Sequence, residues 1–418
     1  MSGLERVIYL NHGLSRPLDR RVGRAMAAFL EESANDPTLL PVDTGVAEAA
    51  LENARQRVAA LAGVDSAQVL FASGATEANN LAIKGLGLGA GDEILIGATE
   101  HTSVQYPART LQKQGVKLRW LPVDHEGRLD PGEVKRRIGA RTRLVAVCAA
   151  EPETGTLQPV EEIGAVCRGR GVALLVDAAA AAGQIPLEPH AWGADLLSLS
   201  AHKFAGPRGV GALIVRPGQR LWPLIEGGVQ EGGRRGGTEN LTGIAGMGEA
   251  AALALRDGAR RSRRLRDLRD RLWEAIRRRI PGSVRHGCPG HCLPGHLSLS
   301  FPGAEGEALL LGLWRRGIVA SSGSACFAHT RKPSYVLRAM GVSEARAQCS
   351  VLFTLGEELQ ECDIETIASV TADTVNHLRG LSATVGRGAG RPRAAEGLDT
   401  GHEPKNDRPR ATQAGTGS

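Results

Sequence analysis

The sequence predicts an α/β protein, with a mostly parallel central sheet in a large domain and a second, smaller α/β domain. Three observations support this fold class. Short, continuous apolar runs alternate with helical patterns between residues 46 and 215, and such runs are typical of strands buried on both faces of a parallel sheet. A long helix with a basic face follows. Beyond it, a further α/β region extends over about 282–381.

The expected strands of the large domain are its short apolar runs, at residues 69–72, 93–96, 144–148, 172–176, 196–200 and 210–215. The later region has one strand-like segment, at 296–301. Ligands of parallel sheets bind outside the carboxyl ends of the strands, so the residues that follow these runs are the first place to look for a site.

The expected domain limits follow the same pattern. We place the large domain at 16–257 and the smaller domain at 1–15 together with 258–385. Residues 386–418 contain a single large aliphatic residue, Leu398, among Gly, Pro and charged residues. Such a tail cannot bury enough apolar surface to order itself, so we expect it to be disordered.

Composition limits the protein class. The 418 residues are 42% hydrophobic, which fits a globular protein, and no apolar run reaches the length of a membrane span. The first ten residues contain no signal-type apolar stretch. Seven widely spaced cysteines, an odd number, favour reduced thiols over a disulfide scaffold. We therefore expect a cytoplasmic protein with no membrane partner.

Much of the net charge of +6 comes from one stretch, residues 256–279. Leu265, Leu268, Leu272 and Ile276 recur there at helical spacing. This pattern indicates a surface helix with a solvated basic face. Nucleic-acid binding is the alternative interpretation, and we expect no direct nucleic-acid partner.

The first polar segment after a strand is Ser73-Gly74-Ala75-Thr76, which precedes a helical pattern. Backbone N–H groups at a helix start bind anions, and Thr76 adds a hydroxyl. An ordinary capped helix is the alternative interpretation of this segment.

The second is Asp177, which follows an apolar strand. A carboxylate there could hold magnesium in a nucleotide hydrolase, but the chain contains no Gly-Lys pair and therefore no phosphate loop of that kind. The other interpretation is that Asp177 pairs with the protonated ring nitrogen of a pyridinium cofactor.

The third is Lys203, which lies between two expected strands and precedes a Gly-rich turn. A lysine at the mouth of a cleft can form a Schiff base when burial lowers its pKa. A lone loop lysine is usually only solvated, but three such segments together favour a cofactor site.

These segments resemble a known family. SGATEANNLAIKG, SLSAHKFAGPRGVGAL, RRGGTEN, SFPGAEGEALL and SSGSAC are similar to signatures of the cysteine desulfurases, members of the class-V aminotransferase group. The resemblance covers roughly residues 7–380. It implies fold type I of the enzymes that use pyridoxal 5'-phosphate (PLP).

The resemblance also implies roles for individual residues. Lys203 would hold PLP covalently, Asp177 would hold its ring nitrogen, and His101 would stack on the ring. The implied cofactor-binding positions are Ala75, Thr76, Asp177, Ser200, Ala201, His202, Lys203 and Thr238. Thr238 would reach the phosphate of a partner subunit, which implies a homodimer.

The implied nucleophile is Cys326, in SSGSAC. It would attack the sulfur of PLP-bound L-cysteine, leaving L-alanine and an enzyme persulfide for an acceptor protein. The acceptor could serve iron–sulfur cluster assembly or the thiolation of tRNA or a small molecule. The alternatives are a divergent PLP enzyme that acts on another amino acid, and a PLP-binding protein that works mainly as a partner.

The chain departs from the family pattern around the cofactor and the substrate. Pro152, in Glu151-Pro152-Glu153, and Ala180 replace the two side chains that donate to the phenolic oxygen of PLP. Leu352 falls where the family has the arginine that binds the substrate carboxylate. The N-terminal signature of the family also differs, since residues 11–16 read NHGLSR, and Pro41 replaces the substrate-side histidine of the early loop.

The Cys and His residues in 286–296 could bind zinc, but Cys288 and Cys292 lack the usual spacing of paired ligands. A turn between domains is the simpler interpretation, and we expect no metal.

Overall fold

The computed structural model describes residues 6–30, 41–323 and 333–388. In these residues a seven-stranded sheet has the order β2-β8-β7-β6-β5-β3-β4. Its strands are β2 (Val69–Ala72), β3 (Glu93–Gly97), β4 (Lys117–Leu121), β5 (Thr142–Cys148), β6 (Ala173–Asp177), β7 (Leu196–Ser200) and β8 (Gly211–Val215).

The strand directions place several loops at one edge of this sheet. β8 runs antiparallel to its two neighbours, β2 and β7, whereas the other described pairings are parallel. The carboxyl ends of β2, β3, β5, β6 and β7 therefore meet at one edge. The mostly parallel central sheet that the sequence predicts is confirmed.

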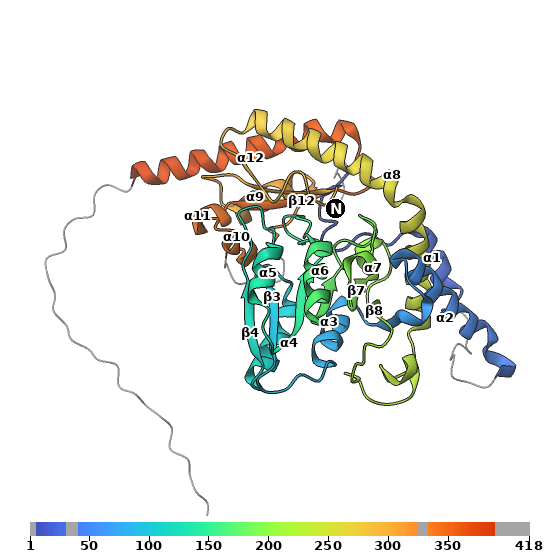
Figure 1. Cartoon of the computed structure of the whole chain (residues 1–418). Helices are drawn as coiled ribbons and strands as arrows, with labels where there is room; N and C mark the ends of the chain where they lie inside the picture. Colours follow the sequence, from blue (N-terminus) through green and yellow to red (C-terminus); the bar gives the residue numbers. More distant parts are fainter. Residues whose placement is uncertain (1–5, 31–40, 324–332, 389–418) are drawn as a thin grey trace, which may run out of the picture.

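Helices cover both faces of the sheet (Figure 1). Val145 and Val147 of β5 pack into one core with α2, α6 and the first part of α8, whereas Leu144 and Ala146 pack into a second core with α3 and α4. Strands buried on both faces read as continuous apolar runs, which explains the sequence pattern. The helices of this part are α1 (Arg20–Ala27), α2 (Pro41–Ala62), α3 (Ala75–Lys84), α4 (Thr102–Lys113), α5 (Pro131–Arg137), α6 (Val160–Arg170), α7 (Pro189–Trp192) and α8 (Leu241–Arg279).

A smaller unit follows, and it holds more strands than the single one expected. β10 (His296–Ser300) pairs antiparallel with both β9 (Val284–His286) and β12 (Ser350–Thr354). β1 (Ile8–Tyr9) pairs parallel with β11 (Ile318–Val319), which ties the start of the chain to this unit. The helices here are α9 (Gly306–Arg315), α10 (Tyr335–Ala339), α11 (Glu344–Ala347) and α12 (Glu361–Gly388).

α8 belongs to both units. Its buried residues up to Ala254 pack into the core of the large sheet, whereas those from Leu265 onward pack into the core of the smaller unit. We therefore propose that the domain boundary near residue 257 lies inside a continuous helix. α12 packs along α8 (Figure 1) and reaches Gly388. The rest of the expected tail, residues 389–418, lies outside the described residues.

The basic half of α8 is a surface helix, as its pattern predicts. Leu265 and Leu272 are buried, while Arg260, Arg271 and Arg277 pair with neighbouring carboxylates. Exposed pairs of this kind contribute about 0–1 kcal/mol each. Neither α8 nor any other helix in the described part of the chain combines the length and apolar composition needed to cross a membrane.

Candidate active site

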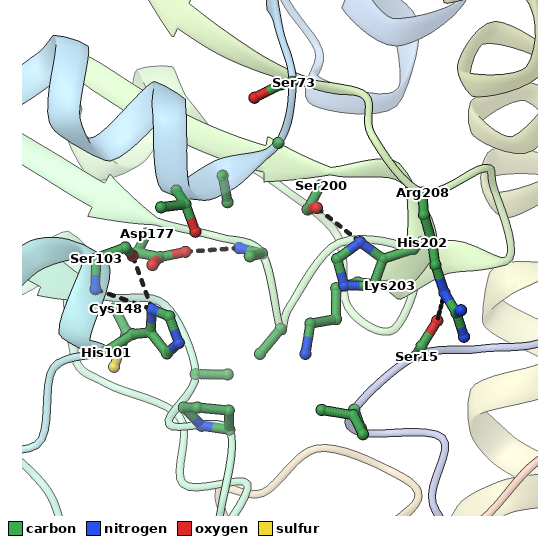
Figure 2. A pocket seen from close by; sticks show the side chains of 18 of the residues that line it. Ser15, Ser73, His101, Ser103, Cys148, Asp177, Ser200, His202, Lys203 and Arg208 are labelled. Carbon is green, nitrogen blue, oxygen red and sulfur yellow. Dashed lines mark hydrogen bonds between the residues drawn. The ribbon is translucent and has the colours of Figure 1, made fainter. Parts of the chain in front are cut away.

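A cavity of about 610 Å³ lies at the edge where the parallel strands end (Figure 2). Its volume is in the range typical of small-molecule sites. Seven residues that sequence reasoning singled out line it together: Ala75, Thr76, His101, Asp177, Ser200, His202 and Lys203. Ala201 is fully buried just behind this wall.

The turn between β2 and α3 brings a helix start to the cavity. Gly74 is the N-cap of α3 and supplies no side-chain cap. Gly211 of β8 lies against it, since a Cβ at Gly211 would come within 2.6 Å of the Gly74 Cα. The glycine at 211 therefore lets the turn approach the sheet closely. Backbone N–H groups and the Thr76 hydroxyl at this helix start suit an anion.

Ser200 and His202 add polar groups to this end of the cavity. Ser200 ends β7, and its Oγ lies 3.0 Å from Nδ1 of His202 (Figure 2). Burial, aided by the charges of Lys203 and Arg208, lowers the pKa of His202 to about 4. The imidazole is therefore neutral at pH 7 and takes part through hydrogen bonds.

Asp177 ends β6 with both carboxylate oxygens held. Oδ1 accepts from the Ala179 backbone N–H at 3.0 Å, and Oδ2 accepts from Nδ2 of Asn79 at 2.8 Å. Asn79 lies on α3 and is fully buried. These two bonds fix the orientation of the carboxyl group before any ligand binds.

His101 is held as one tautomer. It caps α4, and its Nδ1 accepts the backbone N–H of Ser103 at 3.1 Å. Because a backbone N–H can only donate, Nδ1 carries no proton, and the neutral ring carries its proton on Nε2. The Ser103 Oγ lies 2.7 Å from the same Nδ1. Burial lowers the pKa of His101, and Lys203 adds to that shift while Asp177 opposes it.

Lys203 lies in a short 3-10 helix, η2 (Ala201–Phe204), directly after β7. Its Nζ points into the cavity beside His202 (Figure 2) and donates to the Gly13 carbonyl oxygen at 2.5 Å. The segment 9–15 closes this side, because Tyr9, Leu14 and Ser15 also line the cavity. An amine, a carboxyl group, a neutral imidazole and an anion site thus meet in one space. This donor set fits PLP, which offers an aldehyde, a ring nitrogen, a flat ring and a phosphate.

Three residues that depart from the family pattern, Pro152, Ala180 and Leu352, lie in the cavity or in a hollow beside it. Pro152 and Ala180 both line the cavity, and neither side chain can donate a hydrogen bond. Leu352 of β12 is buried and lines a smaller, adjoining hollow together with Lys203 and His101. Its backbone exchanges hydrogen bonds with Ser321. We refer to this second space as the side hollow.

Several lining residues were missed by sequence reasoning, among them Tyr9, Ser103, Cys148 and Arg208. Asn79 behind the wall was also missed, although it lies inside the quoted SGATEANNLAIKG segment and follows Thr76 by three residues, on the same side of α3. Burial, and the carboxylates around it, raise the pKa of Cys148 well above its usual range, so this residue is a neutral thiol.

The remaining predicted site residues are Cys326 and Thr238. Cys326 lies outside the described residues. Thr238 lines a separate, smaller hollow beside Ser73 and Glu231. Nothing in the described chain brings Thr238 to its own main cavity, so its expected role toward the phosphate stays a prediction.

The Cys and His residues of 286–296 are built into the fold of the smaller unit. The thiol of Cys292 contacts the backbone oxygens of Thr154 and His296, and burial raises its pKa. His286 is buried and bonds Ser300. Among the residues that the structure describes, no three His, Cys, Asp or Glu side chains are grouped so as to hold a metal ion.

Comparisons with known proteins identify relatives of this chain. The model of the family "Aminotransferase class-V" matches residues 8–357. The cysteine desulfurase IscS of Dictyoglomus turgidum is 37% identical over 382 residues, which cover 91% of this chain and 97% of that protein. The mitochondrial cysteine desulfurase of Arabidopsis thaliana is 39% identical over 383 residues, covering 90% of this chain and 84% of that protein.

Two solved structures are also similar to this chain. A NifS-like protein superimposes with a TM-score of 0.83 at 30% identity, covering 89% of this chain and all of that one. A structure described as SspA in complex with cysteine has a TM-score of 0.72 at 29% identity, covering 83% of this chain and 98% of that one.

Proposed function

This chain belongs to the class-V aminotransferase family and, within it, to the cysteine desulfurases, and from that premise we propose that it removes sulfur from L-cysteine with the help of PLP. The products are L-alanine and a sulfur atom carried by an enzyme cysteine. The observation that carries the proposal is the meeting of Lys203, Asp177, His101 and the 73–76 turn in one cavity.

Each group has a distinct task. Lys203 would hold PLP covalently, Asp177 would bond its ring nitrogen, and Thr76, Ser200 and His202 would bind its phosphate. When bound, PLP supplies an electron sink for the negative charge that develops at the substrate Cα. Asn79 keeps Asp177 oriented, and His101 holds a proton at Nε2 next to the reacting groups.

The sulfur step needs a thiolate, and we assign it to Cys326 from the family motif. The Cys326 sulfur bonds to the substrate sulfur, and the bond between that sulfur and the substrate Cβ breaks. The electron pair of the broken bond stays on Cβ, which takes a proton, so L-alanine leaves. Cys326 keeps the transferred sulfur as a persulfide.

We propose that the working unit is a homodimer. The segment that leads to Thr238 exposes large apolar side chains: Trp222 is 74% exposed and Val229 is 87% exposed, with Leu224 and Ile225 between them. Large apolar side chains that are exposed within one segment of a monomer are typical of a protein interface. Thr238, at the end of this segment, would then reach the phosphate site of the partner subunit.

The persulfide sulfur would pass to an acceptor protein, and we propose iron–sulfur cluster assembly as the pathway, with thiolation as the alternative. A reducing compartment such as the cytoplasm suits this chemistry, because a persulfide and its parent thiol must stay free of disulfides. The six cysteines of the described chain all have free thiols.

The test is to measure sulfide and L-alanine together after purified protein is given L-cysteine, PLP and an excess of a small thiol. The wild type should form both products in equal amounts. Cys326→Ala should form neither while still binding PLP. Cys362→Ala, which removes an exposed cysteine far from the site motifs, is the matched control and should match the wild type.

Two other outcomes would favour a different function. Consumption of a different amino acid, without sulfide from L-cysteine, would favour a divergent PLP enzyme. PLP binding without turnover of any amino acid would favour a protein that acts as a partner only.

A further inference from the structure

The substrate of the proposed reaction brings a carboxylate into the site, and few cations are available to bind it. Leu352 occupies the place where the resemblance expects an arginine, and no arginine is found among the described residues that line the side hollow. Lys203 lines both spaces but is assigned to PLP. In the described lining of the main cavity, the other cation is Arg208. Arg208 is therefore the guanidinium that a bound anion can meet.

A tight turn carries Arg208 back along η2. Between η2 and β8, the Gly206 backbone N–H donates to the Ala201 carbonyl oxygen at 2.9 Å, and the Ala201 N–H donates to the Val210 carbonyl oxygen at 3.2 Å. Arg208 lies between these bonds, so its backbone is held close to η2. Figure 2 shows its side chain extending along the edge of the cavity toward Ser15.

The segment 9–15, which closes one side of the cavity, contacts both cations. The Gly13 carbonyl oxygen accepts from Nζ of Lys203 at 2.5 Å. Oγ of Ser15 accepts from Nε of Arg208 at 3.3 Å (Figure 2). Two residues of even a fully extended chain span only about 7 Å. Arg208 therefore lies on the side of the cavity where Lys203 presents its amine.

The guanidinium of Arg208 has donors that the protein does not use. Within the described chain its side chain makes one hydrogen bond, from Nε to Ser15, and no ion pair. Asp177, the carboxylate that lines the same cavity, is held by Asn79 and Ala179 instead. A guanidinium has five N–H donors, and Arg208 is exposed. Its terminal nitrogens are therefore accessible to a ligand.

The charge of Arg208 acts on other residues of the cavity wall. Burial lowers the pKa of His202, and the charges of Lys203 and Arg208 add to that shift. Burial raises the pKa of Tyr9, and the charge of Arg208 opposes that shift. Tyr9 and His202 both line the main cavity. These effects agree with the position that the hydrogen bonds give to the guanidinium.

The phosphate of PLP and the α-carboxylate of the substrate are the two anions that Arg208 could bind. The phosphate has other donors, since Thr76 and Ser200 are assigned to it. The carboxylate has lost the arginine that Leu352 replaces. The substrate amine must reach the PLP carbon that Lys203 holds, and the carboxylate is two bonds away from that amine. Because Arg208 lies on the Lys203 side of the cavity, the carboxylate is the better match.

We propose that Arg208 binds the α-carboxylate of the substrate amino acid, in place of the arginine that Leu352 replaces. A guanidinium donates charge-assisted N–H···O⁻ hydrogen bonds to a carboxylate and offsets its charge. Ser15 holds Nε and so limits the directions that the side chain can take. The inference rests on the proposed function, since it concerns the same substrate.

The first test measures binding without turnover, by calorimetry of PLP-loaded protein with L-alanine and with ethylamine, which lacks the carboxylate. Arg208→Gln should weaken L-alanine binding about tenfold to a hundredfold, as expected for lost bonds between charged groups. Ethylamine binding should not change. Arg208→Lys, which keeps the charge but not the planar fork, should lose less affinity for L-alanine than Arg208→Gln. Thermal unfolding checks that each variant is folded.

Arg170→Gln is the matched control for this test. Arg170 is exposed at the end of α6 and precedes β6, so it lies at the edge of the sheet opposite to the cavity. This variant should bind both L-alanine and ethylamine as the wild type does. Equal loss of L-alanine and ethylamine binding in Arg208→Gln would overturn the inference, because the carboxylate would then not be the group that Arg208 recognises.

The second test separates the carboxylate from the phosphate. Titration of apoprotein with PLP, followed by absorbance, gives the dissociation constant for the cofactor. Arg208→Gln should leave this constant unchanged. A large loss of PLP affinity in Arg208→Gln, with L-alanine binding to the loaded protein unchanged, would show that the charge serves the phosphate and would overturn the inference.

The third test asks whether an arginine at position 352 relieves the need for Arg208. Arg208→Gln should cost much less L-alanine affinity in a Leu352→Arg background than in the wild type, because the new guanidinium can bind the same carboxylate. A purely structural role of Arg208 would give the same cost in both backgrounds and would contradict the inference.

Failure of the proposed function would look different. If the wild type formed no sulfide from L-cysteine, while L-alanine binding still depended on Arg208 and ethylamine binding did not, the desulfurase assignment would fall. The carboxylate site at Arg208 would then stand as a site for another amino acid.

Discussion

Asn79 donates one hydrogen bond to Oδ2 of Asp177, at 2.8 Å, and the same amide nitrogen also lies 2.9 Å from the Ser103 hydroxyl. Ser103 in turn bonds Nδ1 of His101. One buried amide on α3 therefore connects the two groups that we assign to the cofactor ring. Both are oriented by the protein itself, before a ligand binds.

Asn79→Leu should weaken PLP binding by the apoprotein at least tenfold. The change removes a hydrogen bond to a carboxylate, worth about 1.5–3 kcal/mol, so Oδ2 of Asp177 loses this donor while Oδ1 keeps the Ala179 N–H. Titration of apoprotein with PLP, followed by absorbance, gives the dissociation constant. Asn80→Ala is the control, because Asn80 bonds only the Thr76 carbonyl of its own helix in the structure. Equal PLP affinity in a folded Asn79→Leu variant would show that Asp177 needs no support.

Leu352→Arg should lower the Michaelis constant for L-cysteine by roughly tenfold. The planar fork of arginine makes two hydrogen bonds to a carboxylate, whereas leucine offers only apolar contact. Leu352→Met, which keeps an apolar side chain of similar size, should behave like the wild type. An unchanged or higher Michaelis constant in a PLP-loaded Arg variant would mean that the substrate group at this wall is not a carboxylate.

Acid should destabilise the fold through histidines that are buried in the neutral form. Burial, with Arg346 nearby, lowers the pKa of His286 to about 4, below its unfolded value of about 6.5. The contribution of neutral His286 to the free energy of unfolding is complete above pH 6.5. It is lost as the pH falls toward 4, at about 1.4 kcal/mol per pH unit, or about 3 kcal/mol in all. Urea unfolding of apoprotein at pH 7 and 4.5 measures this loss.

His286→Gln should reduce the difference in unfolding free energy between these two pH values, and exposed His125→Gln should leave it unchanged. A larger reduction in His125→Gln than in His286→Gln would show that groups other than His286 control stability in acid.

Most of the large sheet could be predicted from sequence, because strands buried on both faces are continuous apolar runs. β4 was missed since it lies at the sheet edge, where Lys117 and Arg119 alternate with less exposed residues. β12 is a buried strand, but SVLFT is only five residues long and its pairing with β10 joins residues about 50 positions apart, which no local pattern marks.

The site could be predicted in part. Ser73–Thr76, Asp177 and Lys203 follow strands directly, so sheet topology alone brings them together. The contact of Asn79 with Asp177 joins residues 98 positions apart, and that of Ser334 with Glu153 joins residues 181 apart. Such contacts depend on tertiary packing, and no local pattern marks them.

The most direct test of the account is to reduce the purified, PLP-loaded protein with borohydride and locate the fixed cofactor by peptide mass spectrometry. Reduction converts a Schiff base into a stable amine, so the attached lysine can be identified. The account predicts label on Lys203, with Lys203→Ala retaining none and the control Lys113→Ala labelled as fully as the wild type. Label on another lysine, or a wild-type protein that retains no cofactor after reduction, would contradict it.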